Sequence, residues 1–221
     1  MTIAMPPKPP APHTRFRTAV EWLHDLGNVP LERIRFDPWP GSATEADVVR
    51  LEERENRLCE LVNGTLVEKP MGLVESIIAG VLIRVLGTFV ESRRLGVVTA
   101  PDGMLRLSRD LVRIPDVAFI SFARMPGGVL PNEPIPSLAP DMACEILSKS
   151  NTPAEMRRKL REYFDAGTRL VWIIDPPTRS ATVHTSPEQS VAIPADGKLS
   201  GAEVLPGFEV ALAELFANVP R

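Results

Sequence analysis

Two acidic residues, Asp116 and Glu145, stand inside apolar segments that the sequence predicts as β-strands, residues 112–121 and 141–147. Side chains alternate between the two faces of a strand, so each carboxylate falls on a face that is otherwise apolar. A buried carboxylate without a partner is costly, and each of these two acids therefore needs a cation.

That cation is either a basic side chain or a metal ion. For a single acid on a strand, an arginine partner or a loop that the acid caps is the commoner explanation. Two acids on neighbouring core strands, with no arginine on either face, favour a shared divalent ion, and oxygen ligands favour Mg²⁺ or Mn²⁺ over Zn²⁺. Without metal the charges of Asp116 and Glu145 should repel. We therefore expect metal to stabilise the fold, and Asp116→Asn to melt no lower than the metal-free protein.

Lys159 is the third candidate for chemistry. In the helix predicted over residues 152–166 it stands at the edge of the buried stripe, one turn before Tyr163, whereas the arginines of that helix fall on the opposite side. Its ammonium could point toward the end of the Glu145 strand. A lysine whose stem merely covers apolar surface explains the pattern equally well.

Local patterns predict the elements that position these residues. Asn63-Gly64 between two alternating segments indicates a β-hairpin with a type I′ turn, and Glu60 lies in its first strand. Residues 73–94 repeat apolar side chains with a helical period. Residues 152–155, Thr-Pro-Ala-Glu, form a capping box with proline at the first helical position.

The order of these elements predicts an α/β fold: a mixed central sheet flanked by helices, with an N-terminal β-hairpin. The continuous apolar run 170–175 suits a strand buried on both faces. We expect a Pro-rich disordered tail over residues 1–16 and one domain over residues 17–221.

Composition restricts the class of protein. The chain has 221 residues and a net charge of −3, which is a weak argument against a dedicated nucleic-acid binder, so any basic surface must be local. No spacing of Cys and His suggests zinc, and Cys59 and Cys144 fit buried free thiols. The apolar stretch 77–90 is interrupted by Arg84, and the N-terminus lacks the apolar core of a signal peptide. We therefore expect a cytoplasmic protein without a membrane partner.

Several short motifs, in order, resemble the Uma-two family of endonucleases within the PD-(D/E)XK, or restriction-endonuclease-like, superfamily. The resemblance covers about residues 44–217. The motifs are Glu60-Leu-Val-Asn-Gly-Thr-Leu-Val-Glu68-Lys-Pro, Arg113-Ile-Pro-Asp116-Val, Glu145-Ile-Leu-Ser148, Lys159-x-x-x-Tyr163-x-x-x-Gly167, Val171-Trp-Ile-Ile-Asp175-Pro and Leu205-Pro-Gly-Phe208.

The resemblance implies a divalent-metal-dependent endonuclease that hydrolyses phosphodiester bonds of nucleic acid, with DNA favoured. Asp116, Glu145 and the backbone carbonyl of Ile146 would hold Mg²⁺ or Mn²⁺. Lys159 would orient the attacking water or stabilise developing charge, and Tyr163 would support Lys159 or touch a phosphate.

Other residues complete this expectation. Glu60 is either a further acid of the metal site or a surface acid of the hairpin. The arginines expected to grip a DNA backbone are Arg106, Arg109 and Arg113. Leu147 stands where the superfamily name places lysine; Lys159 matches the position on the following helix that the family uses, and Lys149 is its rival.

Two alternatives stay open at this point. The chain could be a catalytically inactive nuclease fold that binds DNA or a protein, and divalent-metal binding would discriminate the two. The two carboxylates could also form a glycosidase acid/base pair, which the low aromatic content of 5% disfavours. The pattern leaves a homodimer open.

Overall fold

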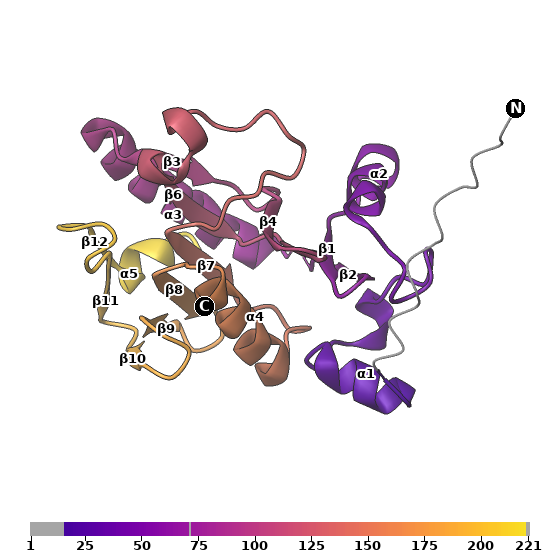
Figure 1. Cartoon of the computed structure of the whole chain (residues 1–221). Coiled ribbons are helices and arrows are strands. Elements are labelled where there is room, and N and C mark those ends of the chain that lie inside the picture. Colours follow the sequence, from indigo (N-terminus) through magenta and orange to yellow (C-terminus); the bar gives the residue numbers. More distant parts are fainter. Residues whose placement is uncertain (1–15, 71, 220–221) are drawn as a thin grey trace, which may run out of the picture.

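The computed structural model describes residues 16–70 and 72–219 (Figure 1). The predicted Pro-rich tail falls, except for Phe16, outside these described residues. At the centre of the fold is a six-stranded sheet with the strand order β10-β9-β8-β7-β6-β3. Its strands are β3 (Gly96–Thr99), β6 (Val117–Ser121), β7 (Met142–Ile146), β8 (Leu170–Asp175), β9 (Ser180–His184) and β10 (Ser190–Ile193).

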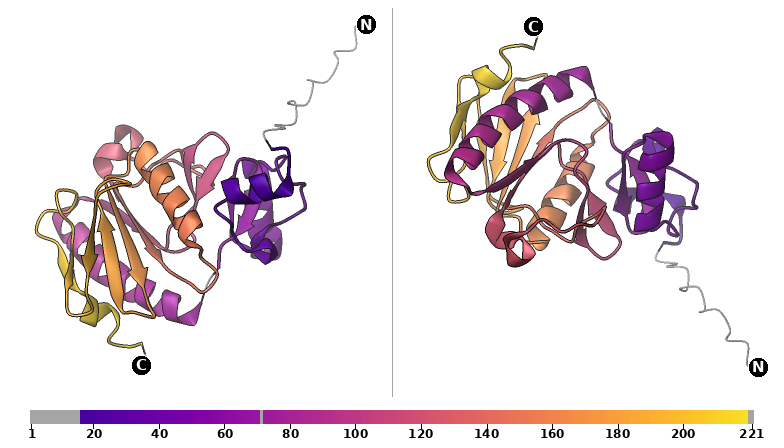
Figure 2. Two further views of the ribbon diagram at one scale, coloured as in Figure 1. Left: turned by 90° about the horizontal axis from the view of Figure 1, so that it is seen from below. Right: turned by 90° about the horizontal axis from the view of Figure 1, so that it is seen from above.

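Two helices cover opposite faces of this sheet (Figure 2). Strands β7 and β8 are parallel and are connected through α4 (Pro153–Asp165), whereas the other neighbouring pairs are antiparallel. Cys144 of β7 packs in the cluster of α3 (Leu73–Arg93), and its neighbour Ala143 packs against α4. The predicted mixed sheet between helices is confirmed, and the alternation of β7 turns Glu145 toward α4.

A smaller sheet, ordered β2-β1-β5-β4, holds the predicted hairpin and lies beside the larger one (Figure 1). Asn63 and Gly64 have φ angles of 50° and 72°, as the type I′ turn requires. The strands are β1 (Cys59–Val62), β2 (Thr65–Glu68), β4 (Leu105–Ser108) and β5 (Leu111–Arg113), and the accompanying helices are α1 (Ala19–Asp25) and α2 (Glu45–Glu55).

The prediction of a single strand over residues 112–121 is wrong. The chain leaves the small sheet at the end of β5 and enters the large sheet at β6, and residues 114–116 form the link between them. Pro115 lies within this link and has no N–H to give to a ladder. Asp116 therefore stands at the entrance to a core strand, where two sheets meet.

Helix α3 forms over the range that its apolar period predicts. Arg94, with a φ of 52°, ends the helix, and Gly96 already belongs to β3. A Cβ at Gly96 would collide with the backbone oxygen of Ile120 on β6, which explains the glycine. By length and composition alone α3 could cross a membrane, contrary to our expectation. Its fully buried residues Ile78 and Leu82 pack on the sheet, and a core helix meets the same test.

The capping box of α4 is confirmed: the Thr152 side chain accepts from the N–H of Glu155, and the Glu155 carboxylate accepts from the N–H of Thr152. Cys59 and Cys144 are buried and free, as predicted. The remaining elements are η1 (Leu31–Arg33), η2 (Phe122–Arg124), η3 (Pro126–Gly128), β11 (Lys198–Ser200), β12 (Glu209–Ala211) and α5 (Leu212–Leu215).

Candidate active site

Asp116 and Glu145 lie next to each other on the sheet face that α4 covers. Val117 pairs with Cys144 in an antiparallel register, so one further step places Asp116 opposite Glu145. The Asp116 N–H donates to the Cys144 oxygen over 3.0 Å, and Asp116 Oδ2 accepts from the Ile146 N–H over 2.7 Å. The Asp116 carboxylate thus accepts a hydrogen bond that a backbone carbonyl would accept in a regular sheet, and this hydrogen bond fixes the position of the carboxylate. Only 7% of Asp116 and 5% of Glu145 is exposed.

Each of these acids has a lysine partner, which corrects the expectation of two unpaired, repelling charges. Lys69 reaches Asp116 from the small sheet, one residue after β2, and its Nζ lies 2.9 Å from Oδ1. The same Nζ donates to the Ile114 oxygen over 2.6 Å. The sequence of the Asp116 strand could not reveal this partner, because it comes from the hairpin.

Glu145 is held from α4. Lys159 Nζ lies 2.9 Å from Oε2, and the Tyr163 hydroxyl donates to Oε1 over 2.6 Å. Lys159 and Tyr163 are one helical turn apart and both buried, so they present their polar ends to the same carboxylate. Burial raises the pKa of Glu145; Lys159 lowers it, Asp116 and Glu60 raise it, and the net direction is upward.

Glu60 joins the same cluster and is fully buried. Its Oε1 lies 3.1 Å from Lys159 Nζ and accepts from the Ile114 N–H over 3.3 Å, while its Oε2 lies 2.6 Å from an Arg113 nitrogen. Burial acts to raise the pKa of Glu60, but Lys159, Arg113 and Lys69 lower it below its usual range. Glu60 is therefore an ionised acid inside the fold, and the alternative of a surface acid is excluded.

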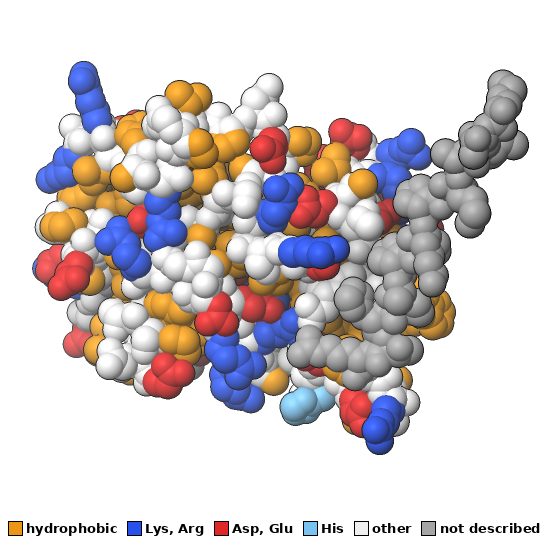
Figure 3. Space-filling model, in the orientation of Figure 1, with side chains coloured by type: hydrophobic (Ala, Val, Ile, Leu, Met, Phe, Trp, Pro, Cys, Tyr) orange, Lys and Arg blue, Asp and Glu red, His pale blue; other side chains and the backbone are white. Residues whose placement is uncertain are grey.

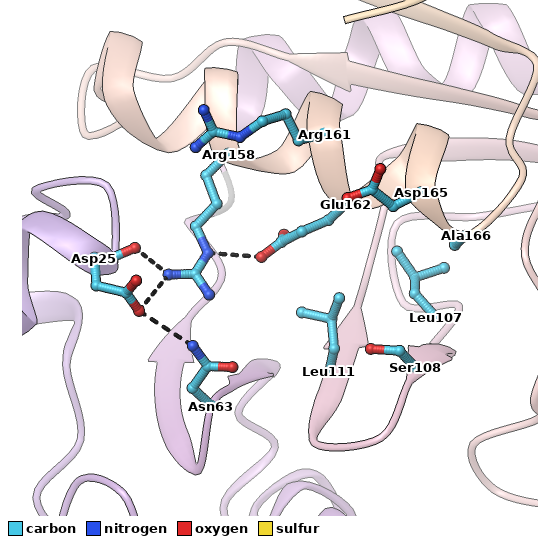
Figure 4. A pocket seen from close by; sticks show the side chains of 10 residues that line it. All are labelled: Asp25, Asn63, Leu107, Ser108, Leu111, Arg158, Arg161, Glu162, Asp165 and Ala166. Atoms are coloured by element: carbon cyan, nitrogen blue, oxygen red, sulfur yellow. Dashed lines mark hydrogen bonds and ion pairs between the residues drawn. The ribbon is translucent and has the colours of Figure 1, made fainter. Parts of the chain in front are cut away.

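A line of ion pairs connects this cluster to the surface. Arg113 binds Glu162 through two nitrogens, at 2.8 and 2.5 Å, and Arg158 binds Glu162 at 2.6 Å. Arg158 also contacts Asp25, and Figure 4 shows its guanidinium between these two acids at the edge of a cavity of about 470 Å³. The cavity lies between α4, the β1–β2 turn residue Asn63 and the β4–β5 hairpin.

This network corrects the predicted DNA contacts. Arg113 is only 2% exposed and is committed to two carboxylates, so it cannot grip a phosphate. Arg106 is bound to Glu45 through two nitrogens at 2.6 Å. Arg109 lies 3.7 Å from Asp110, and 92% of its side chain is exposed, so it is the most accessible of the three arginines. On the face shown in Figure 3, basic side chains alternate with acidic ones and form no continuous basic surface.

The chemistry of the donors fits a hard divalent cation. Asp116 and Glu145 offer carboxylate oxygens, and in an extended strand the carbonyl of Ile146 is expected on the same side as its N–H, which binds Asp116. However, residues 16–70 and 72–219 contain no group of three or more His, Cys, Asp or Glu side chains arranged to hold a metal. All four oxygens of the pair already have protein partners. A divalent ion can therefore bind both carboxylates when some of these hydrogen-bond and ion-pair partners move away from the oxygens.

Five predicted residues are thus brought together: Asp116, Glu145, Lys159, Glu60 and Tyr163. The rival Lys149 is exposed on the loop after β7, whereas the lysines that pair with Asp116 and Glu145 are Lys69 and Lys159. Sequence reasoning missed Lys69 and the structural role of Arg113. A signal existed for Lys69, because it directly follows the second strand of the hairpin whose first strand carries Glu60.

Comparison with known proteins gives the family of the chain and supports its fold. The family model Uma2, described as "Putative restriction endonuclease", matches residues 45–213. A crystal structure from Anabaena variabilis ATCC 29413, described as a putative nuclease belonging to DUF820, has a TM-score of 0.65 and 21% sequence identity. The similarity covers 72% of this chain and 90% of that chain and supports the fold. No curated protein matches the chain. Since the family model spans well over half of the sequence, the protein belongs to the Uma2 family of restriction-endonuclease-like proteins.

Proposed function

We propose that this protein is a divalent-metal-dependent endonuclease that hydrolyses phosphodiester bonds of DNA. The observation that carries the proposal is that Asp116, Glu145 and Lys159, from the link before β6, from β7 and from α4, lie in one buried cluster. The family and the fold support the nuclease class; the metal, the substrate and the reaction are our proposal.

Asp116, Glu145 and the Ile146 carbonyl are the groups that would hold Mg²⁺ or Mn²⁺. The bound ion would acidify a water molecule and neutralise charge on the phosphate. Asp116 is kept in place by the N–H of Ile146 on β7, and Glu145 by Tyr163 on α4, so both acids are held before substrate arrives.

Lys159 would serve as a donor rather than as a base. Burial acts to lower the pKa of Lys159, but Glu145 and Glu60 raise it above its usual range. A lysine held as ammonium can orient a water molecule or stabilise negative charge on the reacting phosphate. Glu60 and Arg113 do not face the reacting atoms in this scheme; they position Lys159.

A second candidate is a nuclease fold that binds nucleic acid or a protein without cutting. It is favoured by one observation: every oxygen of Asp116 and Glu145 is already engaged by a donor of the chain itself. Such a protein would show no metal-dependent cleavage and no Mn²⁺ binding that requires these two acids.

The test is cleavage of plasmid, duplex, single-stranded DNA and RNA with Mg²⁺, Mn²⁺ or EDTA. We expect cleavage of DNA that EDTA abolishes, and a loss of about 100-fold or more in Asp116→Asn and Glu145→Gln. Glu209→Gln is the matched control, because Glu209 is an exposed acid on β12 whose side chain is 58% exposed. Cleavage that survives in both site variants, or in EDTA, would refute the proposal.

A further inference from the structure

The buried cluster is balanced in charge without any metal. Among the described residues it contains four carboxylates, each in contact with at least one basic group: Glu60, Asp116, Glu145 and Glu162. Four basic side chains face them: Lys69, Arg113, Arg158 and Lys159. Arg158 also forms an ion pair with Asp25, which is more exposed than Glu162.

Lys69 is the cation that stands in the way of a metal at Asp116. Its side chain is 3% exposed, and its Nζ is bound to Asp116 Oδ1 at 2.9 Å and to the Ile114 oxygen at 2.6 Å. The other oxygen, Oδ2, accepts from the Ile146 N–H. Asp116 therefore has no carboxylate oxygen without a partner as long as Lys69 stays in place.

A divalent cation that enters alone would leave uncompensated positive charge in this enclosed cluster, which is unfavourable. A phosphodiester supplies negative charge, and an ammonium displaced from Asp116 would find a new partner in a non-bridging phosphate oxygen. This inference rests on the proposed function. We infer that Lys69 is the counter-cation of the metal site while no metal is bound. Binding of the divalent ion would therefore depend on a phosphodiester.

This inference has a reciprocal consequence. If a phosphodiester raises the affinity for Mn²⁺, then Mn²⁺ must raise the affinity for the phosphodiester by the same factor. Lys69 sets that factor, because removing its charge frees Oδ1 of Asp116 for the ion. The effect of Lys69 should therefore appear in binding and not only in turnover.

The experiment measures Mn²⁺ binding to the full chain by electron paramagnetic resonance of the free ion. Binding is compared without DNA, with a phosphorothioate duplex that keeps the backbone charge and resists cleavage, and with a methylphosphonate duplex that lacks the charge. Mn²⁺ bound by each duplex alone is subtracted. For the wild type we expect about tenfold tighter Mn²⁺ binding with the charged duplex only.

The variant Lys69→Gln keeps a donor for the Ile114 oxygen but removes the charge. We expect it to bind Mn²⁺ about tenfold more tightly than the wild type without DNA, and to gain little from the charged duplex. Lys198→Gln is the matched control, since Lys198 lies on β11 with 64% of its side chain exposed, and should behave as the wild type. Circular dichroism verifies that the variants are folded. The comparison of the two duplexes on the wild type tests the inference without any variant.

The outcomes separate the two proposals. The role of Lys69 is overturned if the charged duplex does not change the Mn²⁺ affinity of the wild type. It is also overturned if Lys69→Gln binds Mn²⁺ as weakly as the wild type. If the wild type nevertheless cleaves plasmid in a metal-dependent way, the proposed function stands. Absence of Mn²⁺ binding in every arm, together with absence of cleavage, overturns both.

Discussion

Lys159 Nζ lies 3.1 Å from Oε1 of Glu60, and this contact joins helix α4 to the N-terminal hairpin. The same nitrogen lies 2.9 Å from Glu145 of the large sheet. One ammonium therefore links three elements, and the candidate active site is at the same time a part of the core that holds the two sheets together.

We predict that Lys159→Met lowers both activity and stability. Two buried carboxylates lose their common cation, which should lower the free energy of unfolding by about 3–5 kcal/mol. Cleavage should fall by about 10²–10³-fold if the ammonium stabilises charge in the reaction. Urea denaturation followed by circular dichroism measures the first effect, and initial cleavage rates at a temperature where the variant is folded measure the second. A loss of activity without any loss of stability would contradict the packing that we describe.

Asp116→Asn should destabilise the metal-free protein, the reverse of what repulsion between the two acids implies. The substitution leaves the buried ammonium of Lys69 without its carboxylate, at a cost of about 3–5 kcal/mol in the free energy of unfolding. Chemical denaturation in EDTA measures this cost.

A double-mutant cycle isolates the pair. Lys69→Met alone should also destabilise, and the double variant Asp116→Asn with Lys69→Met should be more stable than the two single effects added together. The exposed pair of Lys198 and Glu209 serves as the control and should show almost no coupling. Additive effects at Asp116 and Lys69 would mean that their ion pair does not form.

Tyr163→Phe should have a smaller effect than Lys159→Met. It removes only the hydroxyl that donates to Glu145 Oε1, and a buried acceptor left without a donor costs about 1–3 kcal/mol. For a chain of this size that corresponds to a fall in Tm of roughly 2–4 °C per kcal/mol. Differential scanning calorimetry in EDTA provides the measurement, with Tyr163→Leu expected to be worse because the aromatic ring is lost as well. A Tm equal to that of the wild type would argue against the hydrogen bond.

Stability should fall on acidification because of Glu155. Arg33 binds both oxygens of this buried acid, at 2.8 and 2.9 Å. Burial acts to raise the pKa of Glu155, but the hydrogen bonds from Arg33 and the charge of Lys159 lower it below the ordinary value of 4.5. A lowered folded-state pKa gives stability that is present above the ordinary value and is lost as the pH falls through the folded-state value.

The measurement is the free energy of unfolding in urea from pH 7 down to about pH 3. Arg33→Met should lower stability at pH 7 and flatten the decline on the acid side, because Glu155 then has less to lose on protonation. Arg57→Met is the control, since the Arg57 side chain is 54% exposed and pairs only at the surface, with Glu68. An unchanged acid limb in Arg33→Met would show that other acids dominate the decline.

Local patterns in the sequence determined much of the scaffold. The Asn63-Gly64 turn, the capping box of α4 and the apolar strand 170–175 depend on neighbours within a few residues, and each forms as predicted. The side-chain period also placed Glu145 on the correct face of its strand, because alternation is a property of the strand itself. The spacing of Lys159 and Tyr163 placed both on one side of a helix, and the structure shows that both contact Glu145.

The partners of the charges were decided only by the tertiary structure. Lys69 meets Asp116, and Arg113 meets Glu60 and Glu162, because the small sheet docks against the large sheet and α4. The division of residues 112–121 between two sheets is equally long-range, since each half bonds to a different set of strands. A sequence shows which residues require a cation, but which cation arrives depends on contacts between segments far apart in the chain, which no local period encodes.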